Sequence, residues 1–388
     1  MSNNFLDVKN VNFRIGGKTK VKDVSFSIKN EGDIVCLLGP SGIGKTTILR
    51  TIAGLENIEK GSIDLKGKTL SSKNLHIEPE HRNISLAFQE NSLFPEGCAW
   101  IEGKYVSINS AAVPITDFGF SRSDCTYDVV GVWDGKFFRI DDHIERFRRS
   151  CESIRLSPPF DWVELKPILH KLVKATGLKN SYVEMIMTRG IPTPGERNPS
   201  KLTNRFYGYA IPYVWVINKE KYEKGVNLIV SEETLRIDPR SVNPKVKNFH
   251  WADLTKGLFE AYDKKADAVI LCDNNGNLTE GPGYNIFIIQ KNSIFTPVEG
   301  VLEGITRKTV LEIASKMKLN IKIQKIHKTI LKKADEIFLT STAGGIIPAT
   351  SLDGIPLKIN EPGTFTKKIN DIYWESHYSG PLIEKVTY

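Results

Sequence analysis

Lys247 and Glu280 are the residues of this chain whose types and surroundings best suit covalent chemistry. Lys247 follows Asn243-Pro244, and because a residue before proline is pushed out of the helical region, the chain enters this segment through a turn or an extended stretch. Apolar residues then recur at helical spacing and predict a helix behind the lysine. These residues are Leu254, Leu258, Ala261 and Tyr262. A lysine held between apolar neighbours is disfavoured as an ammonium, so its amine can attack a carbonyl and hold it as an imine.

Glu280 can supply the second group that such a site needs. An aldehyde held by a lysine points to pyridoxal phosphate, whose ring nitrogen must stay protonated to withdraw electrons, and this requires a fixed carboxylate. Glu280, within Leu278-Thr279-Glu280-Gly281, is the candidate carboxylate. Most lysines are solvated and most glutamates lie on surfaces, so the two residue types alone do not separate a cofactor site from an ordinary surface.

Alternating and periodic patterns predict the elements that must position these two residues. An apolar strand over 268–272 leads to Glu280, and a hairpin with glycine in its turn is expected at 100–106 and again at 131–138. Further strands are expected over 181–190 and 337–339, and further helices from 141 and over 310–317. The length of 388 residues is enough for two or three domains.

Three motifs around these residues resemble one enzyme family. They are Val246-Lys247-Asn248 with Trp251, Gly257-Leu258-Phe259-Glu260-Ala261, and Leu278-Thr279-Glu280-Gly281 with Asn285. In order and spacing they resemble the class IV (fold type IV) pyridoxal-phosphate aminotransferases, above all the (R)-selective amine transaminases, over residues 97–388. The resemblance implies an α/β (α+β) enzyme that forms a homodimer. It also implies a small domain at 97–215, a large cofactor-binding domain at 222–388, and the cofactor at their interface.

The resemblance assigns phosphate binding to further parts of the chain. Arg146 matches the family arginine that grips the cofactor phosphate, a task that suits a permanently charged side chain with several donors. Ile305 and Thr306 stand just before the helix expected at 310–317, where free N–H groups bind phosphate and Thr306 is a natural cap. The loop 341–345 matches the family loop that completes the phosphate cup, with Thr342 as its contact. In an unrelated protein both segments would be ordinary turns.

The resemblance also implies the residues of a substrate pocket. Tyr127 falls on a tyrosine that faces the cofactor, and the alternative for it is a core tyrosine. Arg122 stands where the amine transaminases tend to have a histidine, and Glu184 stands where branched-chain aminotransferases tend to have an arginine. Arg197 lies in a loop in which amine transaminases carry an arginine for the carboxylate of a keto acid. The remaining pocket residues are Tyr182, Trp251 and Ser341.

These assignments predict transamination, in which an amino group moves from a small-molecule amine or amino acid to a keto acid such as pyruvate. Lys247 would hold the cofactor and then carry a proton between donor and cofactor as general base and acid. An (R)-amine or a D-amino acid is favoured as the donor over a branched-chain L-amino acid. A lyase of the same fold, such as those that act on aminodeoxychorismate, is an alternative.

A phosphate-binding motif stands near the start of the chain. Segment 39–46 fits GxxxxGK[ST] and lies between the apolar run 34–38, expected to be a buried strand, and a helix through Ile48, Leu49 and Ile52. In that context backbone N–H groups hold phosphates, Lys45 reaches the outer phosphates and Thr46 binds magnesium, which predicts ATP with Mg²⁺. The predicted contacts are Gly39, Ser41, Gly42, Gly44, Lys45, Thr46 and Thr47.

Residues 1–96 resemble the first part of the ATP-binding subunits of ABC importers, with strands expected at 6–8, 11–13 and 24–28. The likeness implies that Phe13 stacks on adenine and that Gln89 senses magnesium and the attacking water. The sequence has no LSGGQ signature, no Walker B Asp-Glu and no switch histidine. The fragment is therefore expected to bind nucleotide weakly at most, and an importer subunit is the alternative function from a different class.

The change from one resemblance to the other falls at 94–97, without a serine-rich or glycine-rich linker. Two truncated modules joined in this way suggest, as a hypothesis, a gene fusion, a deletion or an assembly error in place of a working two-function protein. Sequencing the genomic DNA across codons 85 to 105 tests this hypothesis, because an uninterrupted reading frame in independent clones argues against an error.

Composition limits the other functions. Five cysteines without CxxC spacing argue against a disulfide framework and a zinc site, and favour reduced thiols in a cytoplasm. We see no charged-then-apolar leader and no run of 18 apolar residues, so neither a signal peptide nor a membrane span is expected. The net charge of +8 is densest over 316–333, where lysines alternate with Leu319, Ile321 and Ile323 as in a half-buried strand. No nucleic-acid recognition motif accompanies it, so nucleic-acid binding is not expected.

Overall fold

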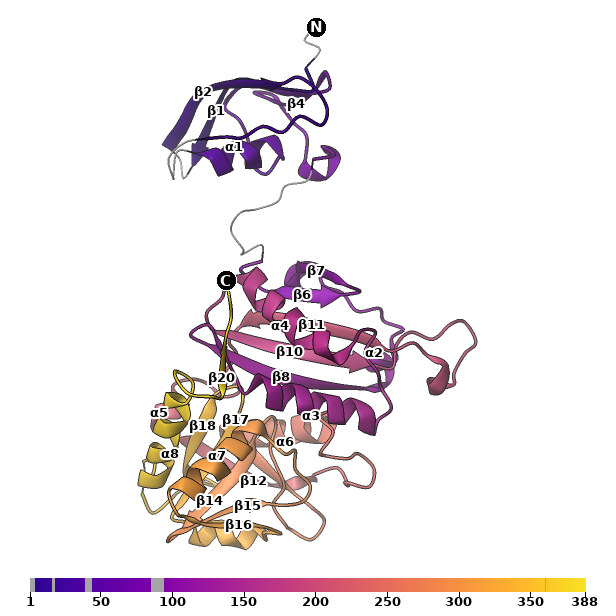
Figure 1. Cartoon of the computed structure of the whole chain (residues 1–388). Helices are drawn as coiled ribbons and strands as arrows, with labels where there is room; N and C mark the ends of the chain where they lie inside the picture. Colours follow the sequence, from indigo (N-terminus) through magenta and orange to yellow (C-terminus); the bar gives the residue numbers. More distant parts are fainter. Residues whose placement is uncertain (1–3, 16–17, 39–43, 85–93, 360) are drawn as a thin grey trace. The chain divides into compact units, whose positions relative to one another are not determined.

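The structure, a computed structural model, describes residues 4–15, 18–38, 44–84, 94–359 and 361–388. The chain divides into two compact units, Met1–Gln89 and Glu90–Tyr388. Figure 1 labels the α-helices and many of the strands of both units. Among the described helices, none is both long and apolar enough to cross a membrane.

The first unit is an antiparallel sheet with one helix packed on it. Its strand order is β2-β1-β3-β4-β5, and the interior contains Leu6, Val8 and Ile63 from the sheet and Ile52 from α1. The strands expected near the start of the chain and the helix after the glycine-rich segment are confirmed. The elements are β1 (Leu6–Ile15), β2 (Lys18–Ile28), α1 (Lys45–Ile52), β3 (Lys60–Leu65), β4 (Lys68–Ser72), β5 (Leu75–His76) and the 3-10 helix η1 (Pro79–His81).

The buried strand expected over residues 34–38 is wrong. These residues form no strand, and Ile34 is 95% and Leu38 is 91% exposed. A strand that is apolar on both faces is stable only inside a sheet with parallel neighbours and covering helices. Every described strand pair of this unit is antiparallel, so the pairing that would bury Ile34 and Leu38 does not form among the described residues.

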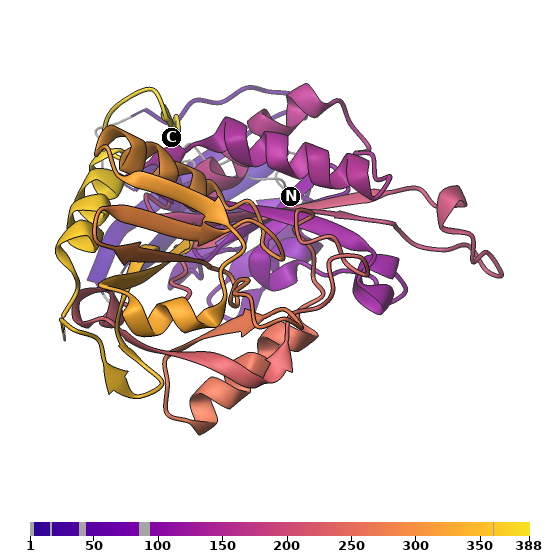
Figure 2. The same ribbon diagram turned by 90° about the horizontal axis from the view of Figure 1, so that it is seen from below.

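The second unit begins its regular structure with an antiparallel sheet in the order β20-β9-β8-β10-β11-β6-β7. Helices α3 and α4 cover it, with Phe147, Leu165 and Leu169 packed on strand residues such as Val130 and Met185. The elements are β6 (Cys98–Ile101), β7 (Lys104–Ser107), the 3-10 helix η2 (Ile108–Ser110), α2 (Phe118–Arg122), β8 (Cys125–Trp133), β9 (Lys136–Phe138), α3 (Ile140–Ser153), α4 (Trp162–Thr176), β10 (Ser181–Thr188), the 3-10 helix η3 (Pro199–Lys201), β11 (Arg205–Pro212) and β20 (Ile383–Lys385). Figure 2 shows the connection between β10 and β11 extending away from this sheet.

Both hairpins expected in this sheet are confirmed. Each turn has two residues in the left-handed region, Glu102 (φ 50°) with Gly103 (φ 81°), and Asp134 (φ 50°) with Gly135 (φ 70°). Two-residue turns of this kind match the right-handed twist of the strands, which is why glycine follows a polar residue there. The helix expected from 141 is α3, and the strand expected over 181–190 is β10.

A second, mixed sheet follows in the order β13-β12-β18-β17-β14-β15-β16, with β19 paired to β18. Strand β12 is parallel to β13 and β18, and β15 is parallel to β16. The elements are α5 (Lys221–Lys224), β12 (Val226–Leu235), α6 (Ala252–Asp263), β13 (Ala268–Cys272), β14 (Asn285–Gln290), β15 (Ser293–Pro297), α7 (Ile305–Lys316), β16 (Asn320–Gln324), the 3-10 helix η4 (Lys328–Lys333), β17 (Glu336–Ser341), β18 (Gly345–Leu352), β19 (Ile355–Pro356) and α8 (Thr364–Glu375). Together the two sheets and their helices confirm the predicted α/β fold of this unit.

Three local expectations for this part are wrong. Helix α7 begins at Ile305 and not at 310, so Thr306 lies in its first turn, and Gly304 is the residue at the cap position. Tyr262 is 58% exposed instead of facing the core from α6. In β16, Ile321 is half-buried but Ile323 is 45% exposed, so the expected buried face is incomplete. The domain limits 97–215 and 222–388 stay a prediction. Strand β20, from the end of the chain, pairs with β9 in the antiparallel sheet of the second unit.

Candidate active site

A cavity of about 200 Å³ lies within the second unit, between its antiparallel sheet and the loops of its mixed sheet. One water occupies roughly 10–15 Å³ on the same measure, so the cavity has room for a small organic molecule. The six predicted cofactor-binding residues all line it: Arg146, Lys247, Glu280, Ile305, Thr306 and Thr342. Four predicted pocket residues line it as well: Tyr127, Tyr182, Trp251 and Ser341. The roles assigned to these residues stay predictions.

Lys247 lies in the irregular segment between β12 and α6, and the helix begins only at Ala252. Its carbonyl oxygen accepts hydrogen bonds from the N–H of Tyr127 at 3.0 Å and the hydroxyl of Thr126 at 2.6 Å, which fixes this segment to β8. The lysine Nζ lies 4.3 Å from the centre of the Tyr127 ring. The expected apolar surroundings are wrong in one respect, because the carboxylates of Glu184 and Glu280 also act on the lysine electrostatically.

Tyr127 is 5% exposed and stacks on Phe249 with ring centres 4.3 Å apart. It is therefore buried and also lines the cavity, so the two alternatives raised by the sequence are compatible. Because Phe249 belongs to the lysine segment, this stacking adds to the two hydrogen bonds between β8 and that segment.

Glu280 is 7% exposed and lies on the segment that turns back beside β13, where its carbonyl accepts a hydrogen bond from the N–H of Leu271 at 3.2 Å. Its Oε2 accepts a hydrogen bond from the N–H of Leu302 at 2.7 Å, and its Oε1 lies 3.1 Å from Nη2 of Arg236. Burial raises the pKa of Glu280 above its usual value, and Arg236 and the Leu302 N–H offset only part of this.

Arg146, on α3, is held by a buried aspartate. Its Nε and Nη2 donate to the two carboxylate oxygens of Asp128 at 2.7 and 2.8 Å, and its Nη1 donates to the carbonyl of Glu303 at 3.2 Å. His143 Nδ1 lies 2.8 Å from the same carboxylate. Burial raises the pKa of Asp128, but the charge and hydrogen bonds of Arg146 outweigh burial and hold this pKa well below its usual range. These contacts use three of the five guanidinium N–H groups, so donors remain for an anion.

The start of α7 can hold a phosphate group. The first N–H groups of an α-helix have no partner within the helix and carry a partial positive charge, which favours an anion. An added Cβ at Gly304 would lie 2.3 Å from Oδ1 of Asn285, so a larger residue would displace this buried side chain. The amide of Asn285 in turn donates to the carbonyl of Leu302 at 2.9 Å. On the opposite loop, Tyr213 donates to the carbonyl of Thr342 at 2.7 Å.

The residues present fit pyridoxal phosphate. Lys247 offers an amine to its aldehyde, Glu280 offers a buried carboxylate to its ring nitrogen, and Arg146 with the start of α7 offers donors to its phosphate. All of these groups line one cavity.

The remaining predicted pocket residues do not line this cavity. Arg122 is exposed on α2, with its guanidinium 3.6 Å from the centre of the Phe118 ring. Arg197 is exposed in the connection that extends from the first sheet. Glu184 lies behind the lining, where its carboxylate accepts hydrogen bonds from Tyr182 at 3.0 Å and Tyr209 at 2.6 Å. Burial raises its pKa, and the tyrosine hydroxyls offset only part of this rise.

Sequence reasoning missed Asp128, His143, Tyr209, Arg236 and Asp253, which hold the predicted residues in place. One signal for Asp128 was available, because an aspartate followed by Val129-Val130 in an apolar strand requires a buried partner. Nothing local pairs Arg236 with Glu280, because the contact joins residues 44 positions apart.

The predicted nucleotide contacts are only partly described. Gly39, Ser41, Gly42 and Gln89 lie outside the described residues, as do the side chains of Phe13 and Thr46. Gly44 is at the cap position of α1 with φ 105°, and Lys45 and Thr47 lie in its first turn. The predicted ATP contacts therefore stay a prediction.

Comparisons with known proteins agree with this geometry. The family model "Amino-transferase class IV" matches residues 126–352, more than half of the chain. The D-alanine aminotransferase of Bacillus licheniformis is 31% identical over 276 residues, 69% of this chain and 92% of the relative. The chain therefore belongs to the class IV aminotransferases, enzymes that use pyridoxal phosphate to transfer amino groups.

Solved structures agree as well. A branched-chain aminotransferase from Thermoproteus uzoniensis, solved with norvaline, has a TM-score of 0.69 and 26% identity and covers 75% of this chain and 99% of its own. The branched-chain aminotransferase of Thermobaculum terrenum in its pyridoxal-phosphate form has a TM-score of 0.67 and 25% identity and covers 77% of this chain and 100% of its own.

A second family model, "ABC transporter", matches residues 21–144 and overlaps the first model over residues 126–144. The pairing of β8 with β10 and the packing of α3 on β8 place the overlapping residues in the fold of the second unit. The ABC likeness thus reaches beyond the first unit in sequence, but the shared residues belong structurally to the aminotransferase.

Proposed function

We propose that this transaminase takes its amino group from an (R)-amine or a D-amino acid and passes it to a keto acid such as pyruvate, with Lys247 as the catalytic residue. The observation that carries the proposal is the convergence of the Lys247 amine, the Glu280 carboxylate and the Arg146 guanidinium on one cavity. When bound, pyridoxal phosphate withdraws electrons from the carbon that bears the donor amine.

The residues of the chain divide the remaining work. Lys247 Nζ takes the proton from the amine-bearing carbon of the donor as general base and then gives it to the cofactor carbon as general acid. The carbonyl contacts of Lys247 with β8 limit its movement to the side chain. Glu280 holds a proton on the ring nitrogen, and Arg146, the start of α7 and Thr342 bind the phosphate.

The choice of donor rests on Glu184. This carboxylate accepts a hydrogen bond from Tyr182, which lines the cavity, and acts electrostatically on Lys247. A buried negative charge repels a donor carboxylate brought to the same side, which disfavours a branched-chain L-amino acid bound with its carboxylate there. We further propose that the chain works as a homodimer in which Arg197 binds the carboxylate of the keto acid. A cytoplasmic location stays a prediction.

The test is the visible absorption spectrum of the full-length protein with pyridoxal phosphate, recorded before and after separate additions of (R)-1-phenylethylamine, D-alanine and L-leucine. We expect a visible band that the first or second compound bleaches, no bleaching by L-leucine, and no such band in Lys247→Ala. Lys256→Ala, which removes an exposed lysine from the neighbouring helix α6, is the matched control and keeps the band. A colourless wild-type protein contradicts the proposal, and bleaching by L-leucine alone contradicts the donor class.

We propose that nucleotide binding by the first unit, if measurable with ATP and Mg²⁺, is weak and not coupled to hydrolysis. The likeness to ABC transporters supports binding, and the missing signature and Walker B carboxylates argue against hydrolysis. Magnesium-dependent release of phosphate from ATP by the full-length protein would contradict this.

A further inference from the structure

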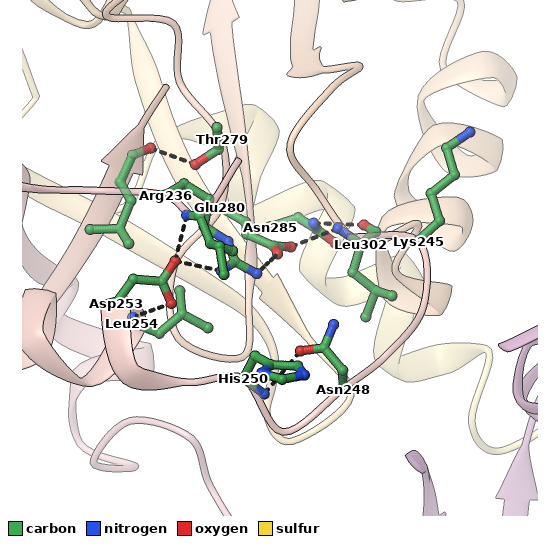
Figure 3. Close-up of polar contacts among 12 residues, drawn as sticks. Arg236, Lys245, Asn248, His250, Asp253, Leu254, Thr279, Glu280, Asn285 and Leu302 are labelled. Atoms are coloured by element: carbon green, nitrogen blue, oxygen red, sulfur yellow. Dashed lines mark hydrogen bonds and ion pairs between the residues drawn. The ribbon is translucent and has the colours of Figure 1, made fainter. Parts of the chain in front are cut away.

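Glu280 belongs to a buried group of three charges that the transaminase reaction does not itself explain. Arg236 follows β12, and its Nη1 and Nη2 lie 2.6 Å from Asp253 Oδ2 and 3.1 Å from Glu280 Oε1 (Figure 3). The side chains of Arg236, Asp253 and Glu280 are 6%, 14% and 9% exposed. Strands β12 and β13 are parallel, with Leu235 paired to Cys272, and the N–H of Arg236 donates to the carbonyl of Cys272 at 2.9 Å. After β13 the chain turns back beside this strand, and the carbonyl of Glu280 accepts a hydrogen bond from the N–H of Leu271 at 3.2 Å, so both residues lie next to the end of β13.

Stability alone does not account for this group. Moving a guanidinium out of water costs several kcal/mol, and an apolar side chain of similar size is often as stable or more so. The Nε of Arg236 is buried and has no hydrogen-bond partner among the described residues. Buried charges with such a penalty are typical of functional sites.

The charges of the group leave one negative charge unmatched. Burial by itself lowers the pKa of Arg236, but Glu280 and Asp253 outweigh burial and raise this pKa, so the guanidinium is protonated. One guanidinium facing two carboxylates gives a net charge of −1 when both carboxylates are ionised. Because Asp253 shares Arg236, this guanidinium neutralises the charge of Glu280 only in part. Lys247 and Arg307 also act on Glu280 electrostatically, but neither belongs to this group of three charges, so the carboxylate can still attract a cation in the cavity. A protonated pyridine nitrogen is such a cation.

The geometry also fixes the direction of the Glu280 carboxylate. Its Oε2 accepts a hydrogen bond from the N–H of Leu302, and its Oε1 accepts one from Nη2 of Arg236, so two of about four lone-pair sites remain open. Asp253 accepts a hydrogen bond from the N–H of Ile237 at 2.8 Å and lies in the first turn of α6. It therefore joins the helix that follows Lys247 to the strand end that carries Arg236.

We propose that Arg236 and Asp253 are positioning residues that keep Glu280 ionised and turned into the cavity, so that the cofactor ring nitrogen is bound in its protonated form. This inference rests on the proposed function of the cavity. Arg236 supplies the positive charge that keeps the buried carboxylate ionised, and Asp253 prevents Arg236 from cancelling that charge completely.

The experiment uses the full-length chain and two measurements. The first is infrared absorption of the cofactor-free protein at neutral pH, in which a protonated carboxyl group gives its own band and Glu280→Gln assigns it. The second is the ¹⁵N NMR signal of ring-labelled pyridoxal phosphate bound to the protein, which separates a protonated from a neutral ring nitrogen. Neither measurement depends on turnover.

We expect wild-type protein to have no Glu280 carboxyl band and a protonated ring nitrogen. Arg236→Met, which removes the charge at similar volume, gains the band and loses the protonated-nitrogen signal, and Arg236→Lys keeps both wild-type signals. Asp253→Asn loses the protonated-nitrogen signal at a lower pH than wild type, which tests the inference even if Arg236→Met does not fold.

A protonated-nitrogen signal that survives in Arg236→Met overturns the inference, and so does a Glu280 carboxyl band in the wild-type protein. If wild-type protein binds no pyridoxal phosphate, the proposed function fails. The infrared comparison of wild type with Arg236→Met then still decides whether Arg236 keeps Glu280 ionised.

Discussion

At the scale of single residues, this site depends on charges that are buried and paired. Asp128 is fully buried and is shared between Arg146 and His143. Burial lowers the pKa of His143, and Asp128 offsets only part of this. The permanent charge that matches Asp128 is therefore that of Arg146, which makes this pair the better target for a test.

We predict that Asp128→Asn destabilises the second unit by about 3–5 kcal/mol at neutral pH, because it leaves the charge of Arg146 buried without its partner. The folded-state pKa of Asp128 lies below its unfolded value of about 3.9. The stabilisation is therefore present above about pH 4 and is lost as the pH falls toward the folded-state pKa. Urea unfolding followed by tryptophan fluorescence measures this, since all six tryptophans lie at or after Trp100.

The matched control is Asp141→Asn on the same helix, where the side chain is 78% exposed. We expect it to change the free energy of unfolding by no more than about 0.5 kcal/mol. A loss in Asp128→Asn that has the same size at pH 7 and at pH 2 would contradict the assigned ion pair.

At the scale of elements, the start of α7 brings the phosphate end of the site together. Its first turn contains Ile305 and Thr306, and Gly304 precedes it in close contact with Asn285. The hydroxyl of Thr306 lies 3.4 Å from that of Tyr373 on α8, so a second helix supports this turn. The position of α7 thus depends on contacts from two other elements, not on its own sequence alone.

We predict that Gly304→Ala weakens binding of pyridoxal phosphate about tenfold, which is roughly 1.4 kcal/mol, because its Cβ pushes the helix start away from Asn285. Fluorescence titration of the cofactor-free protein measures the dissociation constant. Ser315→Ala, in the exposed last turn of the same helix, is the control and leaves it unchanged. Asn285→Ala combined with Gly304→Ala should recover part of the affinity, and equal affinities of Gly304→Ala and wild type would refute the role of this contact.

At the scale of the whole molecule, the chain joins an aminotransferase unit to a unit that is similar to ABC transporters. Each described residue that lines the cavity belongs to the second unit. Phe94 belongs to that unit as well, since its N–H donates to the carbonyl of Ala175 and its ring packs on the first-sheet core.

We predict that a chain of residues 94–388 binds pyridoxal phosphate as tightly as the full-length protein, within about twofold, and keeps the unfolding midpoint of its tryptophan fluorescence. Loss of the visible absorption band of the bound cofactor, or a lower midpoint of urea unfolding, on removal of residues 1–93 would show that the second unit needs the first unit. A chain that begins at residue 98 and lacks Phe94 should unfold at a lower urea concentration, because a partly buried aromatic side chain is lost from the core.

The sequence by itself determined the features that depend on short stretches of chain. Glycine in two turns predicted both hairpins, the apolar pattern through Ile48, Leu49 and Ile52 predicted α1, and the apolar run 268–272 predicted β13. The motifs around Lys247 and Glu280 identified the family. These features follow from backbone geometry and neighbouring side chains, and therefore do not need distant partners.

Features that depend on contacts between distant residues were decided only by the tertiary structure. Residues 34–38 are as apolar as a buried strand, yet they stay exposed because burial requires neighbouring strands that the described part of the first unit does not supply. Helix α7 begins earlier than its apolar pattern because Asn285 and α8 support its first turn. Arg236 reaches Glu280 because both lie beside the end of β13, and Asp253 reaches Arg236 from α6, so the charge of the Glu280 carboxylate depends on contacts between residues far apart in the chain.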